Sequence, residues 1–285
     1  MEVNLDCIPC FQRQALQAAR FITKDECTQE EILREVMSEL MSTEWNTDPP
    51  KMSLAVHSIV REKVDSNDPY SKVKKRDNDI AMEKYDDLKN LIEEANDSFE
   101  TAVRLAIAGN IIDFGANEDF DLDETIDEVL EQKFSIDDSK KLRQKLEKGS
   151  TIVYLVDNCG EIVLDKLFLE TILQMFDIKK ISIGVKGGPI INDATKEDAL
   201  YVGLDKLDPV EFFEVSNGEP RTGPERGSEE LKRILNKGDV IISKGQGNYE
   251  GLSEISDIFF LLMAKCSIIA EKLDAEEGDI ILKHS

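Results

Sequence analysis

Residues 150–285 contain short, β-rich apolar runs separated by helical stretches, and this pattern constrains the fold more than any other feature of the chain. The runs are TIVYLV, KKISIGV, VEFFEV, DVIIS, IFFLLMA and DIILK. TIVYLV and DVIIS do not alternate between apolar and polar residues, which is typical of strands that are covered on both faces, as in a parallel sheet with helices on either side. We therefore expect an α/β fold, with a Rossmann-like three-layer α/β/α domain over residues 150–285.

Residues 1–149 have a helical pattern throughout. Apolar residues recur at helical spacing in TQEEILREVMSELM, DIAMEKYDDLKNLIEEA, DSFETAVRLAIAGNII and DETIDEVLEQ. Thr28 and Glu31 match a capping box, and Asp97 is the expected N-cap of a later helix. Gly149 suits a helix stop. These observations predict an all-helical N-terminal layer or domain without strands. No linker rich in Pro, Gly or Ser joins it to the α/β domain, so a core shared by the two halves is the alternative to separate domains.

The net charge and the ends of the chain argue against several partners and locations. The 285 residues include 35 Lys and Arg against 59 Asp and Glu, a formal charge of −24. An acidic surface repels nucleic acid and anionic membranes, so neither is an expected partner. MEVNLDCIPC has no signal-peptide pattern, and IFFLLMA is too short to cross a bilayer. The 5 cysteines do not indicate a disulfide framework. We expect a reduced, cytoplasmic protein, and the oligomeric state is unknown at this stage.

Polar loops, three of them containing glycine, follow four of the predicted strands. DNCGE follows TIVYLV, KGGPIIND follows ISIGV, KGQGNYE follows DVIIS, and Lys265 with Cys266 follows IFFLLMA. Ligands of open α/β sheets bind beyond the carboxyl ends of the strands, so these loops are expected to form one shared site. Asp, Asn and Gly after a strand are also ordinary turn and cap residues, and each loop alone has that simpler interpretation.

The residue types in these loops suit a metal ion and an anion. Asp157, Asn158 and Asp193 offer hard oxygen ligands for a divalent ion such as Mg²⁺ or Mn²⁺. The helix that begins near Gly160 would direct its positive end at an anion. The lysines expected to neutralise phosphate oxygens are Lys186, Lys244 and Lys265.

Several competing motifs are absent. Asp157 is not followed by the second aspartate of an aspartyl-phosphatase loop, and Cys159 has no arginine six residues further on, as a cysteine phosphatase requires. The sequence contains neither a P-loop nor a G-x-G-x-x-G after a strand. A nicotinamide or conventional methyl-donor site therefore lacks its glycine fingerprint.

Taken together, the motifs resemble a known family. CIPCFQRQALQAAR, AIAGNIIDFGA, DNCGE, VKGGPIINDAT, KGQGNYE and LLMAKCSIIAE are similar to the damage-control, metal-dependent phosphatases, long catalogued as domain of unknown function eighty-nine. The resemblance covers essentially the whole chain and is strongest to short, stand-alone, archaeal-type members. It implies a divalent metal (Mn, Mg, Co or Ni) held by the catalytic residues Asp157, Asn158 and Asp193, and hydrolysis of a small phosphorylated metabolite, such as a sugar phosphate or a damaged phosphometabolite.

The expected substrate contacts come from the same loops and from one helix end. Asn110 and Asp113 lie three residues apart on AIAGNIIDFGA and share a helix face. The resemblance favours a substrate-facing role for them over a simple helix cap. The other candidates are Glu161, Lys186, Lys244, Gln246, Asn248, Tyr249, Glu250 and Lys265.

Two other functions and one motif are left open. A human relative in the family has been described as a carboxyl methyltransferase, so an S-adenosylmethionine-dependent enzyme is the first alternative, and a non-catalytic metabolite-binding module is the second. Cys7 and Cys10 form a CxxC that fits an inert buried pair, part of a metal site or a redox pair. Cys159 has no nearby histidine to act as its base, so we expect a small packed residue.

Overall fold

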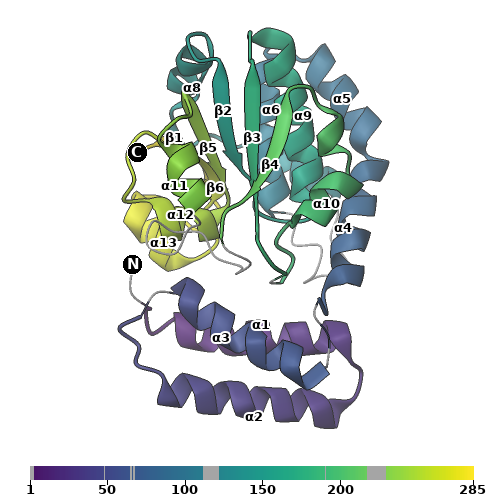
Figure 1. The fold of residues 1–285 in the computed structure, drawn as a ribbon, viewed down its shortest axis with the longest axis vertical. Helices are drawn as coiled ribbons and strands as arrows, with labels where there is room; N and C mark the ends of the chain where they lie inside the picture. Colours follow the sequence, from purple (N-terminus) through teal and green to yellow (C-terminus); the bar gives the residue numbers. More distant parts are fainter. Residues whose placement is uncertain are drawn as a thin grey trace.

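The computed structural model describes residues 3–47, 49–64, 66, 68–111, 122–189, 191–216 and 229–285. A seven-stranded sheet lies at the centre, with helices on both faces and a layer of three helices beyond one edge (Figure 1). The helices that precede β2 are α1 (Cys7–Ile22), α2 (Glu26–Ser42), α3 (Pro49–Val64), α4 (Ser71–Glu83), α5 (Tyr85–Glu94), α6 (Ser98–Ile111), α7 (Leu122–Glu131) and α8 (Ser139–Leu146). Within the described residues, no helix is long and apolar enough to cross a bilayer.

The strands are β1 (Ile136–Asp137), β2 (Thr151–Leu155), β3 (Lys180–Val185), β4 (Val210–Glu214), β5 (Val240–Lys244), β6 (Phe259–Met263) and β7 (Ile280–His284). Between them lie α9 (Glu161–Met175), α10 (Lys196–Tyr201), a 3₁₀ helix (Leu204–Lys206), α11 (Glu229–Leu235), α12 (Gln246–Leu252) and α13 (Ser267–Leu273). The α/β fold and each strand expected after residue 150 are thus confirmed.

The sheet has the order β1-β7-β6-β5-β2-β3-β4 and is mainly parallel. It differs from expectation in two respects. First, β7 pairs antiparallel with β6, so the sheet is mixed. Second, Ile136 and Asp137 pair with β7, and the prediction that residues 1–149 contain no strand is wrong. A two-residue strand is too short to show a hydrophobic period, and its pairing is determined by a partner at the far end of the chain.

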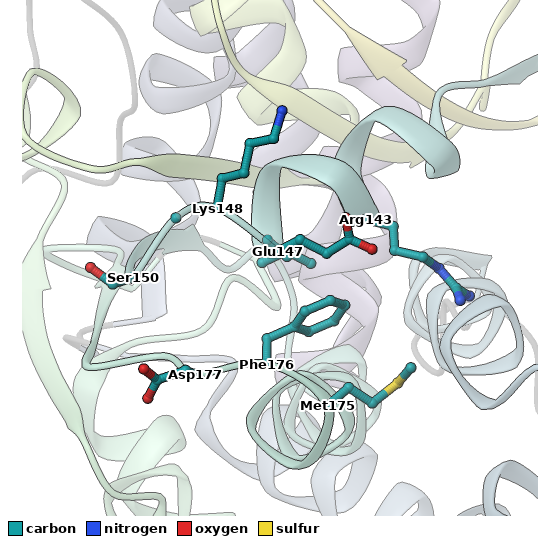
Figure 2. Close-up of a pocket in the computed structure, with 9 residues that line it drawn as sticks. Arg143, Glu147, Lys148, Ser150, Met175, Phe176 and Asp177 are labelled. Atoms are coloured by element: carbon teal, nitrogen blue, oxygen red, sulfur yellow. The ribbon is translucent and has the colours of Figure 1, made fainter.

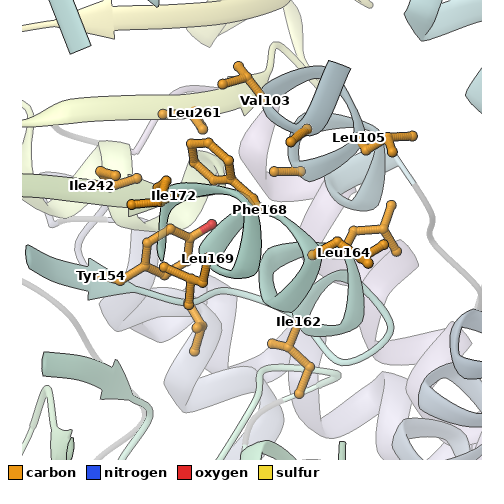
Figure 3. Close-up of a cluster of buried hydrophobic side chains, with 14 of the residues drawn as sticks. Val103, Leu105, Tyr154, Ile162, Leu164, Phe168, Leu169, Ile172, Ile242 and Leu261 are labelled. Carbon is orange, nitrogen blue, oxygen red and sulfur yellow. The ribbon is translucent and has the colours of Figure 1, made fainter. Parts of the chain in front are cut away.

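Successive residues of β2 contact different helical layers, as burial on both faces requires. Ile152 and Tyr154 belong to the core under α6 and α9, whereas Val153 and Leu155 belong to the core under α11, α12 and α13. Figure 3 shows Tyr154 close to Phe168 of α9, and their ring centroids are 6.4 Å apart. The predicted three-layer arrangement follows from this alternation.

The hydrophobic cores do not divide at residue 149. Helices α5 to α8 contribute to the same cluster as β2 and β3, and α4 joins it through Ala81. Helices α1 to α3 form a separate cluster that ends at Tyr70. We therefore propose that the boundary between the helical layer (residues 3–64) and the α/β part lies between Tyr70 and Ala81, instead of between residues 149 and 150.

The predicted helix caps have different outcomes. Asp97 Oδ1 accepts a hydrogen bond of 3.1 Å from the Glu100 N–H, which confirms Asp97 as the cap of α6. The capping box at Thr28 is wrong, because α2 begins at Glu26 and Asp25 accepts from the Thr28 N–H at 3.0 Å. Two potential cap residues stand close together in this sequence, and the earlier one starts the helix.

Chain order places a topological switch point between β2 and β5. From β2 the chain moves outward through β3 and β4, then returns to β5 on the other side of β2. The loops after two strands that diverge in this way leave room for a ligand. The carboxyl edge of the sheet faces the α1–α3 layer (Figure 1).

Candidate active site at the carboxyl edge of the sheet

The loops after β2 and β3 are joined through their backbones. Asn158 and Asp193 form an isolated antiparallel bridge. The Ala194 N–H donates to the Asp157 carbonyl at 2.8 Å, and the Cys159 N–H donates to the Asn192 carbonyl at 2.8 Å. The structure therefore brings the three sequence-predicted metal ligands together, from loops that are more than thirty residues apart in the chain.

Gly245, directly after β5, lies against Asp157. Its φ is +79°, a backbone conformation that L-residues with side chains rarely adopt. A Cβ at this position would lie 1.8 Å from Asp157 Oδ2. The KGQGNYE segment needs glycine here for both conformation and space, because a side chain would collide with the proposed metal ligand.

Lys186 carries a positive charge between the two carboxylates. Its side chain is only 6% exposed, and Nζ donates to Asn248 Oδ1 at 2.8 Å. The same Nζ lies 3.6 Å from Asp193 Oδ2 and 4.0 Å from Asp157 Oδ1. Asn248 is itself fixed, because its Nδ2 donates to the Val156 and Lys244 carbonyls at 3.1 and 2.8 Å. The predicted residues Lys186 and Asn248 therefore act as one unit at the site.

The two carboxylates resist ionisation. Burial raises the pKa of Asp157 to about 7, and the charge of Glu161 adds to this shift, while Lys186 opposes it. Burial also raises the pKa of Asp193, again against the effect of Lys186. Crowded, buried carboxyl groups are stabilised by a proton or by a bound cation.

The donor set fits a hard divalent cation, although it is small. Among the described residues, no group of three or more His, Cys, Asp or Glu side chains is placed to hold a metal ion. The candidate set has two carboxylates and the Asn158 amide, so water or substrate oxygens would complete the coordination. The Asn158 Nδ2 donates to Asp157 Oδ2 at 3.0 Å, which leaves the amide oxygen as the Asn158 atom that would coordinate the metal.

Lys244 lies beneath the site and is fully buried. Its Nζ donates to the Ala106 carbonyl at 2.7 Å, to Glu161 Oε1 at 2.6 Å and to Asp165 Oδ1 at 2.7 Å. An ammonium group has three N–H donors, and all three are engaged. The prediction that Lys244 contacts phosphate therefore does not fit this geometry, and the same holds for Glu161 as a direct substrate ligand, because it too is fully buried.

The buried network around Lys244 reaches the proposed metal ligands. Glu161 Oε2 lies 3.4 Å from Asn158 Nδ2, and Asp165 Oδ1 also accepts from the Tyr154 hydroxyl at 2.7 Å. Burial lowers the pKa of Lys244, but Asp165 and Glu161 outweigh that effect and raise it. Sequence reasoning missed Asp165 and Tyr154. A signal was present, because Glu161 and Asp165 are four residues apart on a helix whose other buried side chains are mostly apolar.

The amide of Gly160, the N-cap residue of α9, is already occupied. The Gly160 N–H donates to Asn78 Oδ1 at 2.6 Å, and Asn78 of α4 is fully buried. The expected anion at this helix end would have to use other donors. Nothing in the local sequence of α4 indicates this contact, because Asn78 lies 82 residues from Gly160 in the chain.

The remaining candidates form one side of the site. Gln246 Nε2 donates to Glu250 Oε1 at 3.0 Å, and Gln246 Oε1 accepts from the Lys265 N–H at 3.0 Å. Lys265 is exposed, and its charge partly opposes the upward shift in the pKa of Asp157. Tyr249 packs into the core against Phe260, with ring centroids 5.0 Å apart. The Asn110 side chain and Asp113 lie outside the described residues.

The cysteines divide into two groups. Cys159 is fully buried within the core, as expected for a small packed residue. Cys7 and Cys10 are partly buried and unbridged. Burial raises the pKa of Cys7, and nearby Glu250 raises it further, so the thiol form is favoured over the reactive thiolate.

A separate hollow of about 460 Å³ lies beside the amino end of β2, away from these residues. Figure 2 shows Arg143, Lys148, Ser150 and Asp177 around it. Arg143 is bound to both carboxylate oxygens of Asp97, at 2.5 and 2.7 Å. The polar side chains of this hollow do not converge on a common point, and we assign no role to it.

Comparison with known proteins identifies similar sequences over nearly the whole chain. The sequence profile of the damage-control phosphatase ARMT1-like domain matches residues 3–281. Damage-control phosphatase PH1575 of Pyrococcus horikoshii is 35% identical over 291 residues, covering 99% of this chain and 97% of that protein. A damage-control phosphatase of Archaeoglobus fulgidus is 31% identical over 294 residues and 99% of both chains.

A solved structure is also similar. The crystal structure of a DUF89 family protein from Pyrococcus horikoshii superposes with a TM-score of 0.88 at 32% identity, over 100% of this chain and 99% of that one. The profile match, the full-length relatives and the shared fold lead to one conclusion: the chain belongs to the damage-control phosphatase family.

Proposed function

We propose that the chain is a metal-dependent phosphomonoesterase that hydrolyses small phosphorylated metabolites, such as sugar phosphates or damaged phosphometabolites. One observation carries the proposal: the buried Asp157 and the partly buried Asp193, both resistant to ionisation, flank the ammonium of Lys186 at the switch point of the sheet. A cation and a phosphate are the two partners that such a charge pattern suits. Membership of a family whose curated relatives are named phosphatases supports the same activity.

Asp157, Asn158 and Asp193 would hold the divalent ion. When bound, such an ion stabilises negative charge on a transferring phosphoryl group and orients the attacking oxygen. Mn²⁺, Mg²⁺, Co²⁺ and Ni²⁺ are all candidates, because oxygen ligands accept each of them.

The protein's own groups bind and orient the substrate. Lys186, held by Asn248, is placed to neutralise a phosphate oxygen. Lys265 adds a second positive charge from the exposed side. The network of Lys244, Asp165 and Glu161 positions Asn158 from below and does not touch substrate.

The nucleophile is either a water molecule or the Asp157 carboxylate. Rapid acid quench of a single turnover with radiolabelled substrate distinguishes the two. Label that stays on the protein identifies Asp157 as the nucleophile, whereas its absence at every time point identifies water.

The activity is tested by phosphate release from a panel of sugar phosphates. The assay is run in chelator and again after each of the four metals is added back. We expect no turnover in chelator and recovery with at least one metal. Full activity in chelator contradicts the metal mechanism. The methyltransferase alternative is tested by calorimetry with S-adenosylmethionine, and saturable binding followed by methyl transfer to a carboxylate would replace the proposal.

A further inference from the structure

Arg61 is a polar bridge between the helical layer and the site. It lies on α3, and its Nη1 donates to the Pro189 carbonyl at 2.9 Å. Pro189 belongs to the loop between Lys186 and Asp193, which are both site residues. The guanidinium therefore reaches this loop from the layer that faces the carboxyl edge of the sheet (Figure 1).

The charge of Arg61 is not balanced by a carboxylate within the described residues. Its side chain is partly buried. Of the other arginines that the structure describes, two are exposed and the rest pair with a carboxylate: Arg13 and Arg20 are exposed, and Arg34, Arg76, Arg104, Arg143 and Arg233 are paired. A partly buried cation without a counter-charge is unfavourable, and a bound anion would offset that cost.

Two groups near Arg61, His57 and Tyr70, are neutral and do not supply that counter-charge. His57 and Tyr70 are hydrogen bonded to one another at 2.7 Å. Burial, with a further contribution from Arg61, lowers the pKa of His57 to about 3, so the ring is uncharged at neutral pH. Burial also raises the pKa of the Tyr70 hydroxyl, which stays protonated.

An anionic substrate of this protein needs positive charge from more than one side. The chain has a net charge of −24, and the site itself contains Asp157 and Asp193. Lys244 is fully engaged below the site, and Lys186 approaches from the sheet. A guanidinium has five N–H donors in a planar fork, and the bond to Pro189 uses one of them.

From these contacts we infer that Arg61 binds the phosphate group of the substrate from the helical layer, across from Lys186. The inference rests on the proposed phosphatase function. Because one guanidinium would contact both the phosphate and the Pro189 carbonyl, substrate binding would also hold the helical layer against the loop that carries Asp193.

The test compares Arg61→Gln with Arg20→Gln, which makes the same chemical change at an exposed position of the same layer. Inorganic phosphate is the probe, used as a competitive inhibitor of turnover and, by calorimetry, as a ligand of the Mn²⁺-loaded protein. For Arg61→Gln we expect the inhibition constant and KM to rise about 10- to 150-fold, the range of one charge-assisted hydrogen bond. Arg20→Gln is expected to match the wild type, and Arg61→Lys to lie between them, because lysine keeps the charge but not the fork.

A second readout separates anion binding from loosening of the helical layer. The dephosphorylated sugar is neutral, so its inhibition constant should stay unchanged in Arg61→Gln if Arg61 contacts phosphate alone. Equal weakening of sugar and phosphate would overturn the inference in favour of a structural role, as would an unchanged phosphate constant in a folded variant. A wild type that neither hydrolyses phosphate esters nor binds phosphate would refute the phosphatase function and this inference together, whereas an active wild type with an unaffected Arg61→Gln refutes the inference alone.

Discussion

Replacing Lys244 with methionine tests whether this lysine belongs to the core of the protein or to its substrate site. The change keeps most of the apolar stem and removes an ammonium that is bonded to Glu161, Asp165 and the Ala106 carbonyl. Two fully buried carboxylates then lose their cation. Removing one partner of a buried ion pair costs about 3–5 kcal/mol. A domain is stable by about 5–15 kcal/mol, so we expect a folded but clearly weakened variant.

The loss of unfolding free energy in Lys244→Met should depend on pH in a defined direction. Burial raises the pKa of Asp165 to about 6, although Lys244 opposes the shift. A carboxyl group with a raised folded-state pKa stabilises the fold while it is protonated, and this contribution disappears as the pH rises through that pKa. Without Lys244 the pKa of Asp165 rises further. The deficit of Lys244→Met should therefore be largest near about pH 8 and smaller near about pH 5, where the carboxyl takes up a proton.

Urea unfolding at the two pH values measures the effect. The control is Lys237→Met, an exposed lysine that should change the free energy of unfolding by less than about 0.5 kcal/mol. Combining Lys244→Met with Asp165→Asn should cost less than the sum of the single changes, because the second removes a charge that the first leaves unpaired. A loss of less than about 1 kcal/mol near pH 8, or strictly additive changes, would refute the core role. A loss of inorganic phosphate affinity that exceeds any loss of Mn²⁺ affinity would restore Lys244 as a substrate ligand.

The other predictions concern the metal ligands and the glycine beside them. Gly245→Ala should reduce both activity and Mn²⁺ affinity by at least about tenfold, because displacing Asp157 costs more than about 1.4 kcal/mol. Gly247→Ala is its matched control, since nothing lies within 4 Å of the added Cβ. Equal effects of the two changes would contradict the steric explanation. Asp193→Asn should abolish Mn²⁺ binding in calorimetry while thermal unfolding of the metal-free protein is unchanged or improved, because a crowded, partly buried charge is removed. Retained Mn²⁺ affinity would exclude Asp193 as a ligand. Because the pKa of Asp157 is raised to about 7, Mn²⁺ must displace a proton to bind below that pH. The affinity for Mn²⁺ should therefore rise with pH up to about 7 and level off above it. A pH-independent affinity without proton release would refute this coupling of metal binding to deprotonation.

Features that depend on local burial could be predicted from the sequence, and features that depend on distant partners could not. TIVYLV and DVIIS formed β2 and β5 because strands buried on both faces are apolar throughout, whatever their neighbours. The loops after them met because parallel strands carry their carboxyl ends to one edge. The pairing of β7 with β1 and β6 depends on contacts between distant parts of the chain, and the local sequences of these strands do not indicate it.

Lys244 shows how the same limit applies to a site. Glu161 and Asp165 lie four residues apart on α9, where the other buried side chains are mostly apolar. Like charges at this spacing repel, and burial makes each of them costly, so the pair requires a cation from another element. That requirement can be derived from the sequence. The identity of the cation cannot be derived from the sequence, because Lys186, Lys244 and Lys265 all follow or end apolar strands. The sheet order decides it: β5 lies next to β2, which brings Lys244 over the start of α9, 79 residues away from Asp165 in the chain. Lys244, at the end of the wholly buried strand β5, thus neutralises the carboxylates of α9. The positive charge that binds the substrate must come from other residues.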